Sequence, residues 1–172
     1  TQMKIGLGGI GKGYAVDRAY DLLRRKGLVN FYINGSGDIR VHSQSDAPRK
    51  WKVGIRNPLS DNKDQMAGII QIANGAVATS GGYAQKMGDH RKGPLDHHIV
   101  HTKQGHSLDE LISVTVLGET AQFCDTTGTI LMNKTAKEAL ALLNQQHLTG
   151  VLIDKSGKTH LSQKALTHFG LS

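Results

Sequence analysis

The sequence predicts a single α+β domain over residues 1–172, with a mixed, largely antiparallel sheet and a few packed helices. Two observations lead to this fold class. Segments with strand character are clustered along the chain, and few segments have helical periodicity. The regular alternation of strand and helix that is typical of doubly wound parallel sheets is therefore not found. A chain of 172 residues is also long enough to bury one sizeable core.

The first expected element is a helix that begins near Lys12 and ends before Gly27, which can cap it. Its apolar positions recur at helical spacing and predict the buried face: Ala15, Ala19, Leu22 and Leu23. A second helix is expected in ETAQFCDTTGTILMN and a third in TAKEALALLNQQ. In the third, Thr135 and Glu138 have the spacing of a capping box.

Strands are expected between and after these helices. LVNFYING predicts a buried strand, and SGDIRVHS continues it or pairs with it. WKVGIRNP and GIIQIANGAVATS follow, the second with Asn74 and Gly75 as a two-residue hairpin turn. ISVTVLG is another strand, and GVLIDKSGKTHLS predicts a hairpin that turns at Ser156 and Gly157. The aromatic residues Trp51, Phe31 and Tyr32 are expected in the core.

Composition excludes several classes of function. The net charge of +7 suits an anionic ligand, but the basic residues are scattered and aromatic residues make up 5%, so we interpret the charge as a solvated surface and predict no nucleic-acid binding. No apolar run approaches the roughly 20 residues that span a bilayer, so this segment is not expected to insert into a membrane. The single cysteine, Cys124, excludes an intrachain disulfide and a multi-cysteine zinc site.

The glycine-rich stretch GLGGIGKG, residues 6–13, matches two nucleotide-binding patterns and satisfies neither. A P-loop needs Ser or Thr after the lysine to bind magnesium, and Gly13 occupies that position. A dinucleotide loop needs an acidic residue at the end of the next strand, where this chain has Asn34. Because Lys12 and a helix N-terminus both favour phosphate, we predict a third kind of phosphate loop. The alternative is a tight turn packed against a neighbour.

Three further motifs carry polar groups suited to a ligand. NGSGDIR places a glycine turn and an acid after a strand, and AVATSGGY ends a strand in a turn that offers Ser80 and the backbone of Gly81. In CDTTGT, Asp125 and Thr129 stand at i and i+4, on one face of a helix. A carboxylate and a hydroxyl so placed can hold a hard cation such as Mg²⁺.

In this order the motifs resemble the ApbE family, the FAD:protein FMN transferases. The resemblance rests on LGGIGKGYAVDRA, NGSGDIR, AVATSGGY, HHIVHTKQGH with SVTV after it, and CDTTGT, and extends from about Lys4 to Leu161. The family has a substantial N-terminal part that helps enclose the flavin. We therefore expect residues 1–172 to be the C-terminal portion of a flavin transferase-like domain.

The resemblance implies a substrate, FAD, and a metal, Mg²⁺, on its pyrophosphate. The implied metal ligands are the Gly9 carbonyl, the Asp125 carboxylate and the Thr129 hydroxyl. The implied cofactor-binding residues are Gly8, Gly9, Lys12, Ser80, Gly81 and Tyr83. Lys12 and His98 are the implied catalytic residues: Lys12 neutralises phosphate charge, and His98 takes the proton from a Ser or Thr hydroxyl of an acceptor flavoprotein, which receives FMN as AMP leaves. An exported, periplasmic location is implied by the family alone.

Two alternatives stay open, namely a pyrophosphatase that splits FAD into FMN and AMP, and a non-catalytic FAD-binding accessory protein. Where the family reads H-I-I-D-P-x-T-G this chain has HIVHTKQG, so that His101 replaces an aspartate, and Gly6 replaces the aspartate that usually opens the glycine loop. Five histidines also lie within one short segment: His90, His97, His98, His101 and His106. They could bind Zn²⁺ or Ni²⁺, but we favour a polar loop because no acid or cysteine completes a site.

Overall fold

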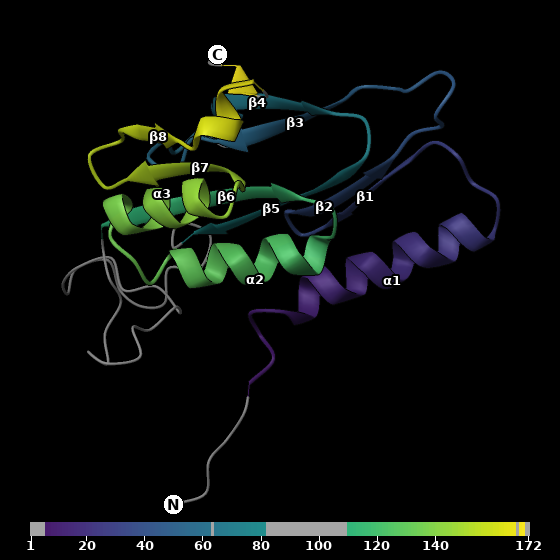
Figure 1. Ribbon diagram of the computed structural model, residues 1–172, viewed down its shortest axis with the longest axis horizontal. Helices are drawn as coiled ribbons and strands as arrows, with labels where there is room; N and C mark the ends of the chain where they lie inside the picture. The colour runs from purple at the N-terminus through teal and green to yellow at the C-terminus, as the bar shows by residue number, and fades with distance from the viewer. Residues whose placement is uncertain (1–5, 63, 82–109, 168, 171–172) are drawn as a thin grey trace, which may run out of the picture.

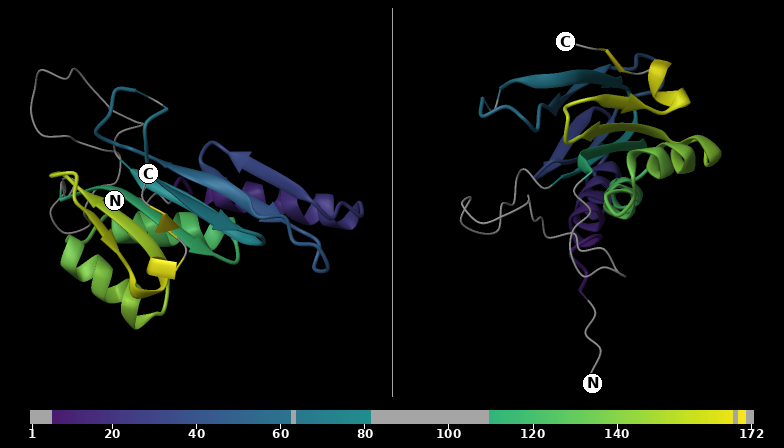
Figure 2. Two further views of the ribbon diagram at one scale, coloured as in Figure 1. Left: turned by 90° about the horizontal axis from the view of Figure 1, so that it is seen from above. Right: turned by 90° about the vertical axis from the view of Figure 1, so that its left-hand side faces the viewer.

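The computed structural model describes residues 6–62, 64–81, 110–167 and 169–170. The elements form three layers, with the helices on one face of a six-stranded sheet and a three-stranded sheet on its other face (Figures 1 and 2). His98, Tyr83 and the histidine-rich segment lie outside the described residues. No helix in the described part of the chain is both long and apolar enough to cross a membrane.

The six-stranded sheet has the strand order β1-β2-β5-β6-β7-β8, and each neighbouring pair is antiparallel. Its strands are β1 (Phe31–Gly35), β2 (Asp38–His42), β5 (Gly75–Gly81), β6 (Leu111–Gly118), β7 (Thr149–Asp154) and β8 (Thr159–Leu161). The second sheet is also antiparallel and contains β3 (Trp51–Arg56), β4 (Met66–Ile72) and β9 (Phe169–Gly170). The predicted α+β class with a largely antiparallel sheet is confirmed.

The helices are α1 (Gly11–Arg25), α2 (Ala121–Leu131) and α3 (Ala136–Gln145), with a 3₁₀ helix, η2, at Gln163–Thr167. The predicted capping box of α3 is present, since the Thr135 hydroxyl accepts from the Glu138 N–H while the Glu138 carboxylate accepts from the Thr135 N–H. Gly27 has a φ of +81° directly after α1, as expected of a capping glycine.

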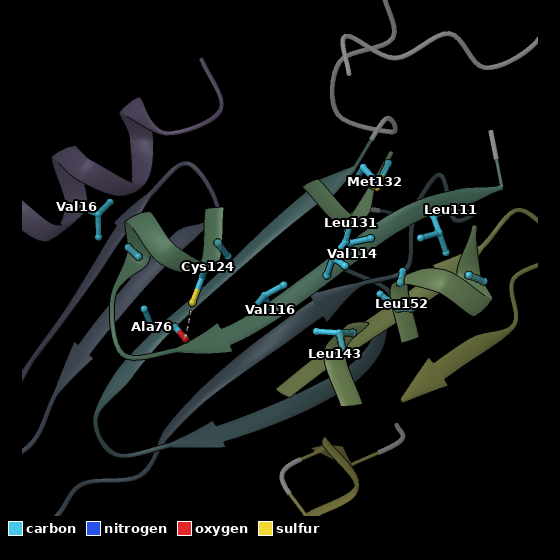
Figure 3. Packing of buried hydrophobic residues seen from close by; sticks show 14 residues of the cluster. Val16, Ala76, Leu111, Val114, Val116, Cys124, Leu131, Met132, Leu143 and Leu152 are labelled. Carbon is cyan, nitrogen blue, oxygen red and sulfur yellow. Dashed lines mark hydrogen bonds between the residues drawn. The ribbon is translucent and has the colours of Figure 1, made fainter. Parts of the chain in front are cut away.

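Two apolar cores lie on either side of the six-stranded sheet, and β6 contributes to both. Val114 and Val116 face the helices, and Figure 3 shows them with Cys124 and Leu131 of α2. Ile112 and Leu117 belong to the second core, which lies between the two sheets. A strand buried on both faces explains the nearly unbroken apolar run LISVTVL.

The predicted hairpin at Asn74 and Gly75 is wrong. β4 pairs with β3 and β9, whereas β5 pairs with β2 and β6, so this short link carries the chain from one sheet to the other. The Asn74 side chain accepts a hydrogen bond from the Ser43 N–H (2.9 Å), and Gly75 has a φ of +120°. The Asn-Gly pair does supply a tight turn, but apolar strand surfaces far apart in the sequence decide which strands pair.

The predicted buried face of α1 is only partly right, since Ala19 and Leu23 are half-buried and the other two positions are not. Ala15 is exposed and Leu22 is 47% exposed, whereas Gly13 and Val16 are buried. An ideal Cβ on Gly13 would lie 2.6 Å from the Ala121 carbonyl oxygen, so the missing side chain is what allows α1 to pack closely against α2. The most deeply buried side of α1 therefore carries Gly13 and Val16.

The strand predicted as buried in LVNFYING is instead the edge strand β1. Phe31 is buried, but Tyr32 is 38% exposed, and Leu28 and Val29 before the strand are exposed as well. The core location predicted for Tyr32 is therefore wrong, while Phe31 is in the core and Trp51 is half-buried. Phe31 and Tyr32 point to opposite faces of the strand, so that one is buried while the other is exposed.

Candidate functional site

The Lys12 side chain is the centre of the candidate site. Its ammonium Nζ lies 2.6 Å from Oδ2 of Asp38 and 3.7 Å from Oδ1 of Asp125. Lys12 stands in the first turn of α1, Asp38 begins β2, and Asp125 belongs to α2. Three elements that are distant in the sequence thus bring one cation and two carboxylates together.

Each oxygen of the Asp125 carboxylate lies near a group of α1. It is 4% exposed, and its Oδ2 accepts a hydrogen bond from the Gly13 N–H at 3.2 Å. The helix N-terminus that the sequence predicts to be open to phosphate therefore gives one of its N–H groups to Asp125. Since the other oxygen of Asp125 lies on the Lys12 side, the carboxylate faces the glycine loop.

Asp38 is more deeply buried, at 1% exposure, and among the described residues its Oδ1 has no hydrogen-bond partner. The pKa of Asp38 is raised to about 6, chiefly because burial disfavours the charged carboxylate. The Lys12 ammonium lowers this pKa, and the nearby Asp125 carboxylate raises it. The NGSGDIR motif marks the turn before this residue, where Ser36 and Gly37 both have positive φ. No spacing rule, however, links Asp38 to Lys12 across 26 residues.

The glycine loop and α2 are in contact at Gly9 and Thr129. Gly9 lies against Thr129, because an ideal Cβ on Gly9 would be 3.3 Å from Thr129 Cγ2 and 3.6 Å from its Oγ1. Thr129 is one turn after Asp125 in α2. At Gly8, by contrast, an added Cβ would meet nothing within 4 Å, so the outer part of the loop is open.

The Ser80 side chain and Gly81 lie on opposite faces of the six-stranded sheet. Ser80 is 8% exposed and lies under α2, where an ideal Cβ on Gly128 would approach its Oγ to 2.8 Å. The next residue, Gly81, faces the space between the two sheets and lines a cavity there. Gly128 is a poor residue for a helix interior, and this close contact with Ser80 explains its presence.

The cavity between the sheets has a volume of about 280 Å³ and lies on the opposite face of β2 and β5 from Lys12. It is lined by both apolar and polar residues: Tyr32, Asn34, Ser36, Gly37, Ile39, Val53, Gly54, Ile55, Arg56, Val77, Thr79 and Gly81. The Ser36–Gly37 turn borders it and leads directly into Asp38. This turn therefore connects the cavity with the carboxylate cluster.

A carboxylate of α1, Asp17, binds the start of α2. Its Oδ1 accepts hydrogen bonds from the Ala121 N–H (2.9 Å) and from Arg40 Nη1 (2.7 Å), and its Oδ2 accepts from the Gln122 N–H (3.0 Å). Sequence patterns do not predict this contact, because Asp17 and Ala121 are 104 positions apart. The helix that carries Asp125 is thus attached to the helix that carries Lys12.

The donor set suits a hard cation. The described residues contain no group of three or more His, Cys, Asp or Glu side chains placed to hold a metal ion. What the loop and α2 offer instead are carboxylate oxygens of Asp125, the Thr129 hydroxyl and backbone carbonyls, with the unpartnered oxygen of Asp38 nearby. Oxygen donors without nitrogen or sulfur are those that Mg²⁺ prefers, so these residues fit the metal implied by the sequence.

Comparison with known proteins agrees with this fold. The profile of the ApbE family matches residues 1–153, and the chain belongs to this family. Among its relatives is a FAD:protein FMN transferase of Klebsiella pneumoniae (strain 342), which is 30% identical over 169 residues, or 97% of this chain and 51% of the relative. A FAD:protein FMN transferase of Vibrio cholerae is 29% identical over 147 residues, which cover 84% of this chain and 43% of the relative.

Solved structures share the same architecture. The ApbE protein of Thermotoga maritima superposes with a TM-score of 0.84 at 26% identity, covering 96% of this chain and 53% of that protein. The flavin transferase ApbE of Vibrio cholerae, at 24% identity, has a TM-score of 0.74 and shares the fold. The chain spans about half the length of the curated relatives that it matches.

Proposed function

We propose that this chain takes part in the magnesium-dependent transfer of FMN from FAD to a Ser or Thr hydroxyl of an acceptor flavoprotein, with release of AMP. One observation carries the proposal: the glycine loop that contacts Thr129 also places the Lys12 ammonium beside the Asp125 carboxylate. The relatives named as FAD:protein FMN transferases supply the reaction. An exported, periplasmic setting is part of the proposal and rests on the family resemblance.

The proposed metal ligands are the Gly9 carbonyl, the Asp125 carboxylate and the Thr129 hydroxyl. A bound Mg²⁺ would neutralise the pyrophosphate and favour departure of AMP. Lys12, with its side chain 46% exposed, can reach a phosphate oxygen while it stays near Asp38. The open backbone at Gly8 lets a ligand approach the loop closely.

The flavin nucleotide is proposed to extend from this loop toward the end of β5. Ser80 and Gly81 lie at that end of β5 and are proposed to contact the nucleotide. Tyr83, which belongs to the same motif, is proposed to do so as well and lies outside the described residues. His98 is proposed to take the proton from the acceptor hydroxyl as the new oxygen–phosphorus bond forms and the bond to AMP breaks. With water in place of the acceptor, the same attack would give FMN and AMP.

An intact-mass assay tests this proposal. The protein is incubated with FAD, Mg²⁺ and a candidate acceptor domain, and acceptor mass and free AMP are followed together. An acceptor heavier by one FMN, with an equal amount of AMP, supports the transferase. AMP released without a modified acceptor indicates the pyrophosphatase. Bound but unchanged FAD indicates a non-catalytic relative, for which the replacement of an aspartate by His101 would be the first cause to test.

A further inference from the structure

The new inference concerns Asp38 and rests on the metal site of the proposed function. Lys12 stands between two buried carboxylates, Asp38 at 1% and Asp125 at 4% exposure. Its ammonium does not share them equally, since it lies 2.6 Å from Asp38 and 3.7 Å from Asp125. The first distance is that of a charge-assisted hydrogen bond, and the second is beyond hydrogen-bond distance.

This asymmetry matters because an ammonium and a divalent cation compete for the same carboxylate oxygens. If Lys12 were in direct contact with Asp125 Oδ1, a metal ion would have to displace it. The Lys12 side chain is 46% exposed, so its packing does not prevent such a move. Asp125 itself cannot turn away easily, because its Oδ2 accepts the Gly13 N–H.

We infer that Asp38 is a positioning residue that holds the Lys12 ammonium away from Asp125 and so leaves Asp125 open to a divalent cation. Two observations support this role. Asp38 comes from a different element than either partner, and its carboxylate is the nearer one to Lys12. The ammonium thus stays beside the metal position without occupying it.

A positioning role for Asp38 and a direct attraction of the cation by its charge have different consequences when Lys12 is removed. Without the Asp38 charge, Lys12 is expected to move onto Asp125 and block it, so Asp38→Asn should weaken metal binding only while Lys12 is present. If Asp38 merely attracts the cation, or binds it directly, the same substitution weakens binding whether or not Lys12 is there. The two roles are separated by a double-mutant cycle.

The test is the Mn²⁺ affinity of four forms of the protein, measured without FAD by the loss of the free Mn²⁺ electron paramagnetic resonance signal. Mn²⁺ serves because it accepts the oxygen donors that Mg²⁺ uses. We expect Asp38→Asn to weaken binding about tenfold or more, and Lys12→Met with Asp38→Asn to bind within about threefold of Lys12→Met alone. Equal weakening in both backgrounds overturns the inference and leaves the metal site intact. No Mn²⁺ binding by the wild type overturns the metal site and the inference together.

A second measurement needs no substitution at Asp38. In protein labelled with ¹⁵N-lysine and ¹³C-aspartate, NMR can detect the scalar coupling across the hydrogen bond from Lys12 Nζ. We expect its partner to be the Asp38 carboxyl carbon, both before and after Mg²⁺ is added. Coupling to Asp125 in the metal-free protein would overturn the inference.

Discussion

The Gly13 N–H donates a hydrogen bond to Asp125 across the contact between α1 and α2, with an N···O distance of 3.2 Å. The same glycine allows the two helices to approach, since an ideal Cβ would lie 2.6 Å from the Ala121 carbonyl oxygen. Helix packing and the orientation of the proposed metal ligand therefore depend on one position. A change that separates the helices would also displace Asp125 from Lys12.

Gly13→Ala is expected to destabilise the protein by about 2 kcal/mol or more, because the added methyl overlaps backbone atoms of α2 that cannot move independently. Urea unfolding followed by circular dichroism measures the free energy of unfolding. Gly11→Ala is the matched control. It lies in the same turn, nothing is within 4 Å of its ideal Cβ, and it should leave stability unchanged or slightly raised. Equal stability of both variants would contradict the close helix contact.

Asp17→Ala should lower the free energy of unfolding by about 2–3 kcal/mol, since it leaves two N–H groups of α2 without an acceptor and Arg40 without its partner. Asp21→Ala is the control on the same helix. Asp21 is half exposed, and its contact with Arg18 is 3.9 Å long, so its loss should cost under about 0.5 kcal/mol. Chemical unfolding of both variants under identical conditions makes the comparison, and a neutral Asp17→Ala would disprove the anchoring role.

Asp38 gives stability a distinct pH dependence. Its pKa is raised from 3.8 to about 6 in the folded protein. As the pH falls, the folded state therefore binds this proton at a higher pH than the unfolded state does. The contribution is fully present below pH 3.8 and is lost as the pH rises through 6. In EDTA, Asp38→Asn should therefore gain stability relative to wild type between pH 4 and 7, by about 2 kcal/mol. Unfolding free energies of both proteins across this range test the sign, and a constant difference would refute it.

Cys124 is expected to be unreactive in the native protein. Its side chain is fully buried, its Sγ donates to the Ala76 carbonyl (Figure 3), and burial, reinforced by the carboxylates of Asp17, Asp38 and Asp125, raises its pKa to about 12. A thiol reagent such as DTNB should label it at least ~10³-fold more slowly in buffer than in 6 M guanidinium. Rapid labelling without loss of circular dichroism would show that α2 leaves the sheet readily.

The parts of the fold that the sequence predicts correctly depend on neighbours along the chain. The capping box of Thr135 and Glu138 lies within one helical turn, and the hairpin at Ser156 and Gly157 joins adjacent strands, with Gly157 at a φ of +85°. Such features follow from local rules of hydrogen bonding and backbone geometry. The hairpin prediction at Asn74 and Gly75 failed because an Asn-Gly turn can also connect strands of two different sheets.

The site was predictable to the extent that its residues share a helix or a loop. Asp125 and Thr129 lie one turn apart in α2, as their i and i+4 spacing predicts. The Lys12–Asp38 pair and the contact of Asp17 with α2 join residues 26 and 104 positions apart. No periodicity encodes those distances, so only the folded chain reveals them.

The most direct test of the account is the Mg²⁺ dependence of AMP release from FAD, compared between wild type and Asp125→Asn. Asparagine keeps an acceptor for the Gly13 N–H but removes the charge that the metal requires. We predict AMP release by the wild type that EDTA abolishes, a loss of about 100-fold or more in Asp125→Asn, and no loss in the exposed control Asp21→Asn. Release by Asp125→Asn at the wild-type rate and the same Mg²⁺ concentration would contradict the assignment of this cluster as the metal site.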